Sequence, residues 1–125
     1  MWPKNRRSKY NAIKINDPVH GRFDSQKEFR VYLDLLIEKK HVEQNGGKME
    51  IERQVPFMIL PKCIDDNGKT IFRERKYIAD FFIIKEIPGQ IKREYVIDAK
   101  GFRTTEYKLK KHMLFTRHGI YIEER

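Results

Sequence analysis

The sequence predicts an α/β fold in which helices flank a central mixed β-sheet. Two segments carry apolar residues at helical spacing, and between them lie several segments rich in β-branched and aromatic residues. The second helical segment follows a strand and precedes a short apolar run, which implies a crossover and a parallel strand pair. At 125 residues and 15.2 kDa, the chain has the size of one domain.

Residues 1–14 are predicted to form a basic arm that precedes a single domain of residues 15–125. The basic and aromatic residues of this arm are Lys4, Arg6, Arg7, Lys9 and Lys14 with Trp2 and Tyr10. Basic arms commonly bind nucleic acid, and the alternative is a solvated, partly disordered terminus. Residues 12–23 then predict a short strand or a loose hairpin.

The first helix is predicted to begin at the capping box Ser25–Glu28, in which a hydroxyl residue is followed three positions later by Glu. It should run to about Lys40, because the Gln-Asn-Gly-Gly stretch at 44–47 breaks it. Five apolar residues recur at helical spacing and are expected on its buried face: Phe29, Tyr32, Leu33, Leu36 and Ile37.

Strand patterns cover residues 49–60, 70–85 and 93–100. Pro56 lies inside the first, which indicates an edge strand or a bulge. Asn67-Gly68 predicts a hairpin with a type I′ turn, because these two residues tolerate positive φ angles. Pro88-Gly89 turns the chain between the second and third strands, so that these two strands should pair with each other.

A second helix and a short strand complete the predicted fold. Thr104 or Thr105 can cap the helix, which should run to about Arg117 before Gly119 stops it. Its inner face is expected to contain Tyr107, Leu109, Met113 and Leu114. Residues 120–122 form the last predicted strand.

The charge of the chain favours a polyanionic partner. Lys and Arg number 27 against 18 Asp and Glu, which gives a net charge of +9. The alternative is a basic but unspecialised surface. No stretch approaches the ~20 apolar residues of a membrane span, and no secretory signal is recognised. The single cysteine, Cys63, predicts a reducing, cytoplasmic setting and is interpreted as a small packed residue.

Two acidic residues lie in otherwise apolar strands. Asp80 stands in Ile-Ala-Asp-Phe-Phe and Asp98 in Val-Ile-Asp-Ala. A hairpin folded about residues 88–89 sets these two positions almost opposite each other. Two carboxylates at that separation repel unless a cation lies between them, and Mg²⁺ is often held by only one or two protein carboxylates. The sequence therefore predicts a divalent cation site.

Lys100 is expected to share a face with Asp98, because side chains two residues apart on a strand point the same way. A metal polarises a phosphate and helps to ionise water, while an amine orients that water or stabilises developing charge. These groups together favour phosphodiester hydrolysis. Two alternatives stay open: Asp98 and Lys100 can form an ordinary salt bridge, and Asp80 can be a satisfied buried acid.

These residues resemble the PD-(D/E)XK nuclease superfamily, which includes type II restriction enzymes and archaeal Holliday-junction resolvases. A closer likeness is to a family of small phage proteins of unknown function, over residues 9–123. Tyr-Ile-Ala-Asp-Phe at 77–81 and Asp-Ala-Lys-Gly at 98–101 are specific together, although neither is alone. Further matches lie at 9–11, 23–28, 52–54 and 104–110. The superfamily's leading proline is absent, since Ala79 precedes Asp80.

The resemblance implies a restriction-endonuclease-like fold and assigns roles to particular residues. Asp80 and Asp98 would bind Mg²⁺, with Mn²⁺ as a substitute, and the backbone carbonyl of Ala99 often completes such a site. Lys100 would be the catalytic lysine. Glu28 would face the metal from the first helix, although it is also the Glu of the capping box. Glu52 is the reserve candidate for this acid, and Gln54 would support the site by hydrogen bonding and contact the DNA.

The resemblance also implies a DNA partner and a homodimer inside the host cell of a phage. Basic residues expected to contact phosphates are Arg6, Arg7, Lys9, Arg103, Lys108, Lys110 and Lys111. The function expected is Mg²⁺-dependent endonucleolytic cleavage of branched DNA, such as a Holliday junction. Paired incisions at a branch need two active sites, hence the dimer. The alternatives are a nucleic-acid-binding module that does not cleave, and a nuclease for flaps, nicks or linear ends.

Overall fold

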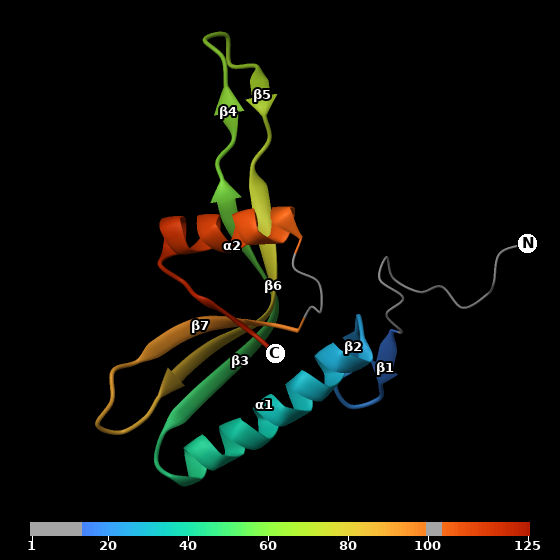
Figure 1. Cartoon of the computed structure of the whole chain (residues 1–125), viewed down its shortest axis with the longest axis vertical. Helices are drawn as coiled ribbons and strands as arrows, with labels where there is room; N and C mark the ends of the chain where they lie inside the picture. The colour runs from blue at the N-terminus through green and yellow to red at the C-terminus, as the bar shows by residue number, and fades with distance from the viewer. Residues whose placement is uncertain (1–13, 100–103) are drawn as a thin grey trace, which may run out of the picture.

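The computed structural model describes residues 14–99 and 104–125 (Figure 1). The arm residues Arg6, Arg7 and Lys9, together with Lys100 and Arg103, lie outside these ranges. In the described chain, the elements in order are β1 (Ile15–Asp17), β2 (Gly21–Phe23), α1 (Gln26–Gln44), β3 (Lys48–Leu60), β4 (Cys63–Ile64), β5 (Thr70–Phe72), β6 (Arg75–Glu86), β7 (Arg93–Asp98), α2 (Thr105–His118) and β8 (Ile122–Glu124).

The central sheet of the described chain has four strands in the order β3-β6-β7-β8. β3 pairs antiparallel with β6, β6 antiparallel with β7, and β7 parallel with β8. The α/β class with a mixed central sheet is therefore confirmed, and so is the parallel pair that the crossover through α2 predicts. β3 lies at one edge of this sheet, which is where Pro56 is tolerated.

Each helix buries one face of the sheet. α1 covers one core cluster and α2 covers the other. Tyr95 and Ile97 pack in the first cluster and Val96 in the second, as alternation along a strand requires. The sheet is thus enclosed by α1 and α2 on opposite faces, and the described protein has one core on each side of it.

α1 begins as predicted but is longer, and its buried face is rotated from the predicted one. The Ser25 hydroxyl accepts a 3.0 Å hydrogen bond from the Glu28 backbone N–H, which caps the helix. The buried apolar residues are Val31, Leu35 and Val42, whereas Ile37 is 69% exposed. The prediction for Ile37 was wrong because the many apolar residues of this helix are compatible with more than one buried stripe.

α2 has the predicted caps. The Thr104 hydroxyl accepts from the Tyr107 N–H at 3.1 Å, and Gly119 ends the helix with a φ of 68°. Tyr107 and Leu114 are buried as expected, but Leu109 is 55% exposed. The inner face is therefore narrower than predicted. The last strand was predicted two residues early, since β8 begins at Ile122 and Ile120 packs in the loop before it.

The hairpin around Asn67-Gly68 is present, but three details of its prediction were wrong. The predicted strand 70–85 is divided into β5 and β6. The turn is not type I′, because Gly68 has a φ of 81° while Asn67 does not adopt a positive φ. Asp65 holds the turn instead, accepting from the Asn67 and Lys69 backbone N–H groups. Cys63 is exposed rather than packed.

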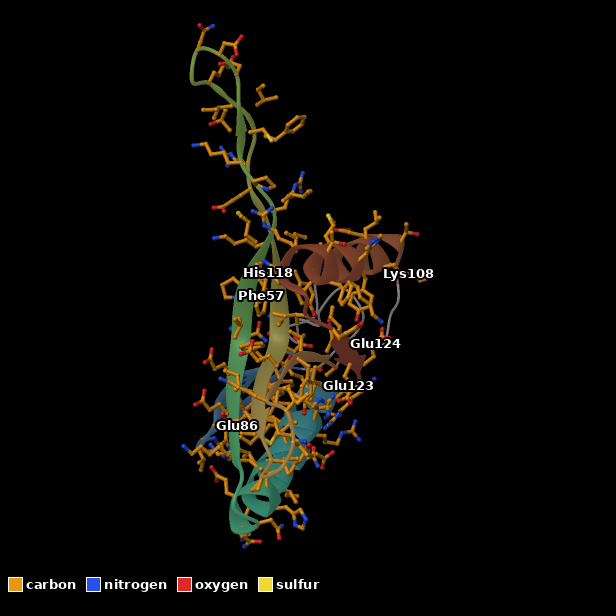
Figure 2. The ribbon with its side chains drawn as sticks, turned by 90° about the vertical axis from the view of Figure 1, so that its left-hand side faces the viewer. Phe57, Glu86, Lys108, His118, Glu123 and Glu124 are labelled. Atoms are coloured by element: carbon orange, nitrogen blue, oxygen red, sulfur yellow. The ribbon has the colours of Figure 1, made fainter. Side chains whose placement is uncertain are left out.

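The two strands of the β3–β6 ribbon continue beyond the core as a projecting hairpin (Figure 1). In the side view, the projecting part extends well past α2, with Phe57 and His118 near its root (Figure 2). The His118 ring lies against that root, with Nε2 2.7 Å from the Met58 carbonyl oxygen. Among the described helices, none combines the length and apolarity needed to cross a membrane.

Candidate functional site

Asp80 and Asp98 lie side by side on adjacent strands. The antiparallel register of β6 and β7 runs from Lys85 opposite Arg93 to Phe81 opposite Ile97. Continued by one residue, that register sets Asp80 opposite Asp98. Both carboxylic acids are buried, with Asp80 7% exposed and Asp98 1% exposed. The structure therefore brings together the two acids that the sequence singled out, which we call the acid pair.

The surroundings of Asp80 disfavour its ionised form. Burial raises the pKa of Asp80 to about 7, with a further increase from the charges of Asp98 and Glu28. One interaction acts in the opposite direction: the Ala99 backbone N–H donates to Asp80 Oδ2 at 3.0 Å. This bond fixes the carboxylate against the end of β7. The acid pair thus combines an ordered geometry with an unfavourable concentration of negative charge.

Tyr77 fixes the second acid. Its hydroxyl donates to Asp98 Oδ2 at 2.7 Å, and the Tyr77 side chain is 2% exposed. Burial and the Asp98 charge raise the pKa of Tyr77 well above its ordinary value, so that the hydroxyl stays protonated and remains a donor. This role of Tyr77 is not predictable from the sequence, because an aromatic residue in an apolar strand is typical of a core residue.

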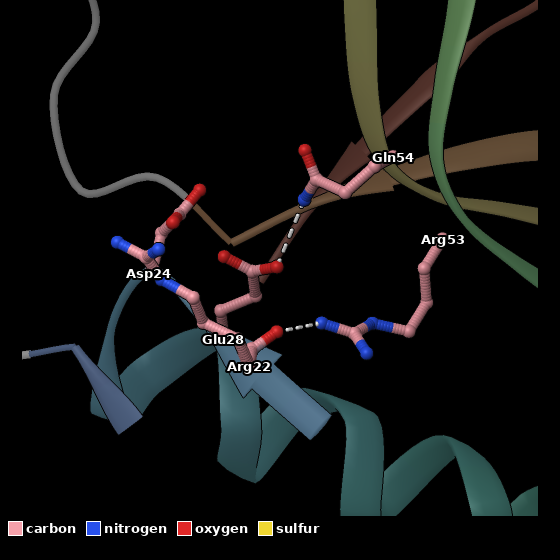
Figure 3. Close-up of a pocket in the computed structure, with 5 residues that line it drawn as sticks. All are labelled: Arg22, Asp24, Glu28, Arg53 and Gln54. Carbon is pink, nitrogen blue, oxygen red and sulfur yellow. Dashed lines mark hydrogen bonds between the residues drawn. The ribbon is translucent and has the colours of Figure 1, made fainter. Parts of the chain in front are cut away.

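Glu28 approaches from the first turn of α1 and is also buried. The side-chain amide of Gln54 donates to Glu28 Oε1 at 3.0 Å (Figure 3). Burial, followed by the charge of Asp24, raises the pKa of Glu28. The capping bond of this helix uses the Glu28 backbone N–H, so the capping geometry leaves the carboxylate able to face Gln54. Gln54 was expected to support the site by hydrogen bonding, and the partner that the structure gives it is Glu28.

Gln54 marks a local distortion of the β3–β6 ribbon. It has a φ of 52°, and no other non-glycine residue in the described ranges has a positive φ. The neighbouring pairs, Arg53 with Phe81 and Val55 with Ala79, place it opposite Asp80. Gln54, Asp80 and Asp98 therefore form one row across three strands.

The ribbon changes its buried face at this row. Residues two apart on a regular strand share a face, yet Phe81 packs with the α1 cluster and Ala79 with the α2 cluster. The same change occurs along β3, where Met49 packs with the first cluster and Ile59 with the second. Because the ribbon changes its buried face here, the row lies near both Glu28 on α1 and Tyr77, which packs in the α2 cluster.

A pocket of about 400 Å³ opens beside Glu28. Its lining residues are Arg22, Asp24, Glu28, Arg53 and Gln54 (Figure 3). The Arg53 guanidinium lies 3.7 Å from the centre of the Phe23 ring and donates to the backbone carbonyls of His20 and Arg22. The pocket therefore places a fixed positive charge near an acid of raised pKa.

The acid pair has the chemistry of a divalent cation site of the magnesium type. Mg²⁺ prefers oxygen ligands and is often held by one or two carboxylates with water and substrate phosphate. Two facing buried carboxylates fit that description, and a bound cation would relieve their repulsion. In the ranges that the structure describes, no group of three or more His, Cys, Asp or Glu side chains has the geometry of a metal site. Glu52, the reserve candidate, is exposed on β3.

The predicted phosphate-binding residues of α2 differ in their surroundings. Lys108 is exposed, and Figure 2 shows it on α2. Lys110 lies 3.2 Å from Glu106, and Lys111 lies 3.4 Å from Glu124. Such surface pairs contribute about 0–1 kcal/mol, so both lysines can exchange their partners for phosphate. The structure does not bring these lysines into the acid pair.

Comparison with known proteins yields a family without a stated activity. No curated protein and no solved structure matches the chain. One family model matches residues 7–123, a range that includes both acids, Glu28, Gln54 and Tyr77. The chain belongs to the family described as "Protein of unknown function (DUF1064)".

Proposed function

We propose that the protein is a Mg²⁺-dependent DNA endonuclease that cleaves branched DNA such as a Holliday junction. The observation that carries this proposal is the acid pair, in which Asp80 and Asp98 face each other, buried, on adjacent strands. Without a cation, the two buried carboxylates repel each other inside the fold, which destabilises it. This cost favours a metal-binding role for the two acids over a purely structural one.

Asp80 and Asp98 would hold the cation. The backbone carbonyl of Ala99, the residue directly after Asp98, would add a third oxygen ligand. Bound Mg²⁺ would supply charge to polarise the scissile phosphate and to activate water, and Mn²⁺ would substitute for it. Tyr77 keeps Asp98 oriented by its hydrogen bond. The Ala99 N–H does the same for Asp80. The chain thus supplies an oriented ligand pair before the substrate arrives.

Glu28 and Lys100 complete the proposed site. Glu28 lies close enough for its charge to raise the pKa of Asp80, and Gln54 holds its carboxylate. We assign it to assist the cation directly or through a water molecule. Lys100, two residues after Asp98 in the sequence, would orient the attacking water or stabilise charge on the phosphate.

The arrangement of elements supports a restriction-endonuclease-like fold of the PD-(D/E)XK type. A helix carries Glu28, three antiparallel strands follow, the acids occupy the second and third of these strands, and a helix crosses over to a parallel strand. The net charge of +9 supports DNA as the partner. Because a branch needs paired incisions, we propose a homodimer.

The test is cleavage of a labelled four-way junction in Mg²⁺ and, separately, in Mn²⁺. We expect paired incisions by the natural chain, none by Asp98→Asn, and unchanged junction binding by that variant. Asp34→Asn, an exposed acid of α1, is the matched control and should cleave normally.

Two results would contradict the proposal in different ways. Tight junction binding without incision in either metal would identify a nucleic-acid-binding module that does not cleave. Equal or faster cutting of flaps, nicks or linear ends would leave the nuclease assignment in place and reject the branched substrate.

A further inference from the structure

The hairpin that projects from the β3–β6 ribbon is exposed along nearly its whole length. We call residues 60–76 the β4–β5 arm. Every residue in this range is exposed except Asp65, which is partly buried by its own turn. The arm extends past α2 in both views (Figures 1 and 2). An isolated two-stranded ribbon is marginally stable in water, so a long exposed one is typical of a segment that binds a partner.

The charges of the arm are unbalanced in favour of cations. Its basic residues are Lys62, Lys69, Arg73, Arg75 and Lys76, and its acidic residues are Asp65, Asp66 and Glu74. Asp65 already accepts from two backbone N–H groups of the turn. Glu74 lies 3.9 Å from Lys76. The other four basic side chains form no ion pair with the residues described here, and they are available for an anionic partner.

Four apolar side chains accompany these cations. Leu60, Ile64, Ile71 and Phe72 are between 45% and 66% exposed. Aliphatic and aromatic side chains on a basic ribbon suit apolar contact with thymine methyl groups, which lie in the major groove of DNA. A second copy of this chain is a poorer occupant, because it would bring an arm with the same excess of positive charge.

We propose that the β4–β5 arm is a second DNA-binding element, which lies in a groove beside the duplex arm that the acid pair cleaves. This inference rests on the proposed function, since it takes DNA as the substrate. A two-stranded ribbon fits the major groove of B-DNA. At ~3.3 Å per residue of extended chain, the eight residues from Phe72 to Asp80 span about 26 Å, within one ~34 Å turn of the duplex. The arm would thereby fix the distance between the cut and the bound groove.

The test compares two triple variants in binding a fluorescein-labelled four-way junction in EDTA, where no cleavage occurs. The arm variant is Lys62→Gln, Lys69→Gln and Arg73→Gln. The control is Lys40→Gln, Lys48→Gln and Lys92→Gln, three exposed lysines at the opposite end of the sheet. We expect the arm variant to lose about tenfold or more in affinity at 0.1 M salt. Its slope of log K against log salt should fall by about 2 to 3.

The unique cysteine gives an independent readout, because Cys63 is exposed on the arm. Maleimide should alkylate Cys63 several-fold more slowly when the junction is bound. Labelling at an unchanged rate, under conditions where the natural chain is saturated with junction, would overturn the inference.

The remaining outcomes separate this inference from the proposed function. If the natural chain binds and cleaves but the arm variant binds as tightly as the control, the arm inference fails alone. If the natural chain binds no DNA, both fail. Ile71→Ser with Phe72→Ser should weaken junction binding without changing the sedimentation coefficient of the free protein. A shift from dimer to monomer with DNA affinity unchanged would instead identify the arm as a protein contact.

Discussion

Asp80 of the acid pair and the β4–β5 arm belong to the same β3–β6 ribbon, yet they differ in burial and in polar contacts. At the acid pair both side chains are buried and hydrogen-bonded, and burial raises the pKa of Asp80. In the arm, which reaches its turn at Gly68, 12 residues before Asp80 in the sequence, almost every side chain is exposed. The buried acid pair indicates chemistry because its charge is costly, whereas the arm indicates recognition because four of its five cations form no ion pair with the described residues and its apolar side chains are exposed.

Asp80→Asn should produce the largest change in that comparison. Cleavage should fall by on the order of 10³-fold or more, since removing groups one step outside a metal site already costs about 10- to 100-fold. Stability should move the other way, because the amide removes the repulsion with Asp98 and can still accept from the Ala99 N–H. Single-turnover junction cleavage and thermal melting of the metal-free protein measure the two effects. A variant that cleaves normally, or that unfolds, would reject a metal role for Asp80.

The second-largest difference between the acid pair and the β4–β5 arm should appear in how the free energy of unfolding depends on pH. Asp80 has a pKa of about 7 in the folded protein against 3.8 ordinarily. Between these values the folded state retains a proton that the unfolded chain releases, so the free energy of unfolding falls as pH rises. The slope from this group is at most about 1.4 kcal/mol per pH unit. Melting in EDTA from pH 4 to 8 should show this loss in the natural chain and much less of it in Asp80→Asn.

Added Mg²⁺ should change the pH dependence of thermal melting. Because a cation between the two acids favours their ionised forms, added Mg²⁺ should stabilise the natural chain more at pH 8 than at pH 5. The arm-charge variant should follow the natural chain in both conditions. If the free energy of unfolding depends on pH in the same way in the natural chain and in Asp80→Asn, the pKa of Asp80 is not raised in the folded protein.

Tyr77→Phe should have an intermediate effect. The change removes one hydrogen bond to a buried carboxylate and should cost about 1.5–3 kcal/mol of stability. Since Asp98 would also lose an orienting donor, Mg²⁺ affinity should weaken several-fold, a readout that a purely structural role would not change. Calorimetric Mg²⁺ titration and urea unfolding test both effects. Tyr95→Phe, which removes the hydroxyl of another buried tyrosine, opposite Ile83 in the α1 cluster, is the control and should leave Mg²⁺ affinity intact.

The sequence was sufficient for the acid pair because the relevant information is local. The Pro88-Gly89 turn sets the register of the two strands that it joins, and the register then places Asp80 opposite Asp98. Glu28 and Gln54 were chosen through the resemblance, and their hydrogen bond appears only in three dimensions. Tyr77 was missed because a hydroxyl in an apolar strand can reach a polar partner that no spacing predicts.

The faces of the ribbon and the helices were harder to predict. Gln54 adopts a left-handed φ that no residue preference indicates, and the ribbon exchanges its buried face there. Ile37 and Leu109 are exposed because both helices contain more apolar residues than their narrow contacts with the sheet can cover. The β4–β5 arm was predicted as part of two continuous strands joined by a turn. The sequence could not show how far it projects, because that depends on how much of the ribbon the two helices cover.

Apolar substitutions in the arm should have the smallest effect on the fold. Ile71→Ser with Phe72→Ser removes side chains that are 56% and 66% exposed, so the free energy of unfolding should change by no more than about 0.5 kcal/mol. By contrast, Ile97→Ser, fully buried beside the acid pair, should cost several kcal/mol because it leaves a cavity and an unpaired hydroxyl. Urea unfolding of the metal-free protein compares the two. A loss in the arm variant that approaches that of Ile97→Ser would show that the arm packs against the body of the protein in solution, and the contrast between the two regions would disappear.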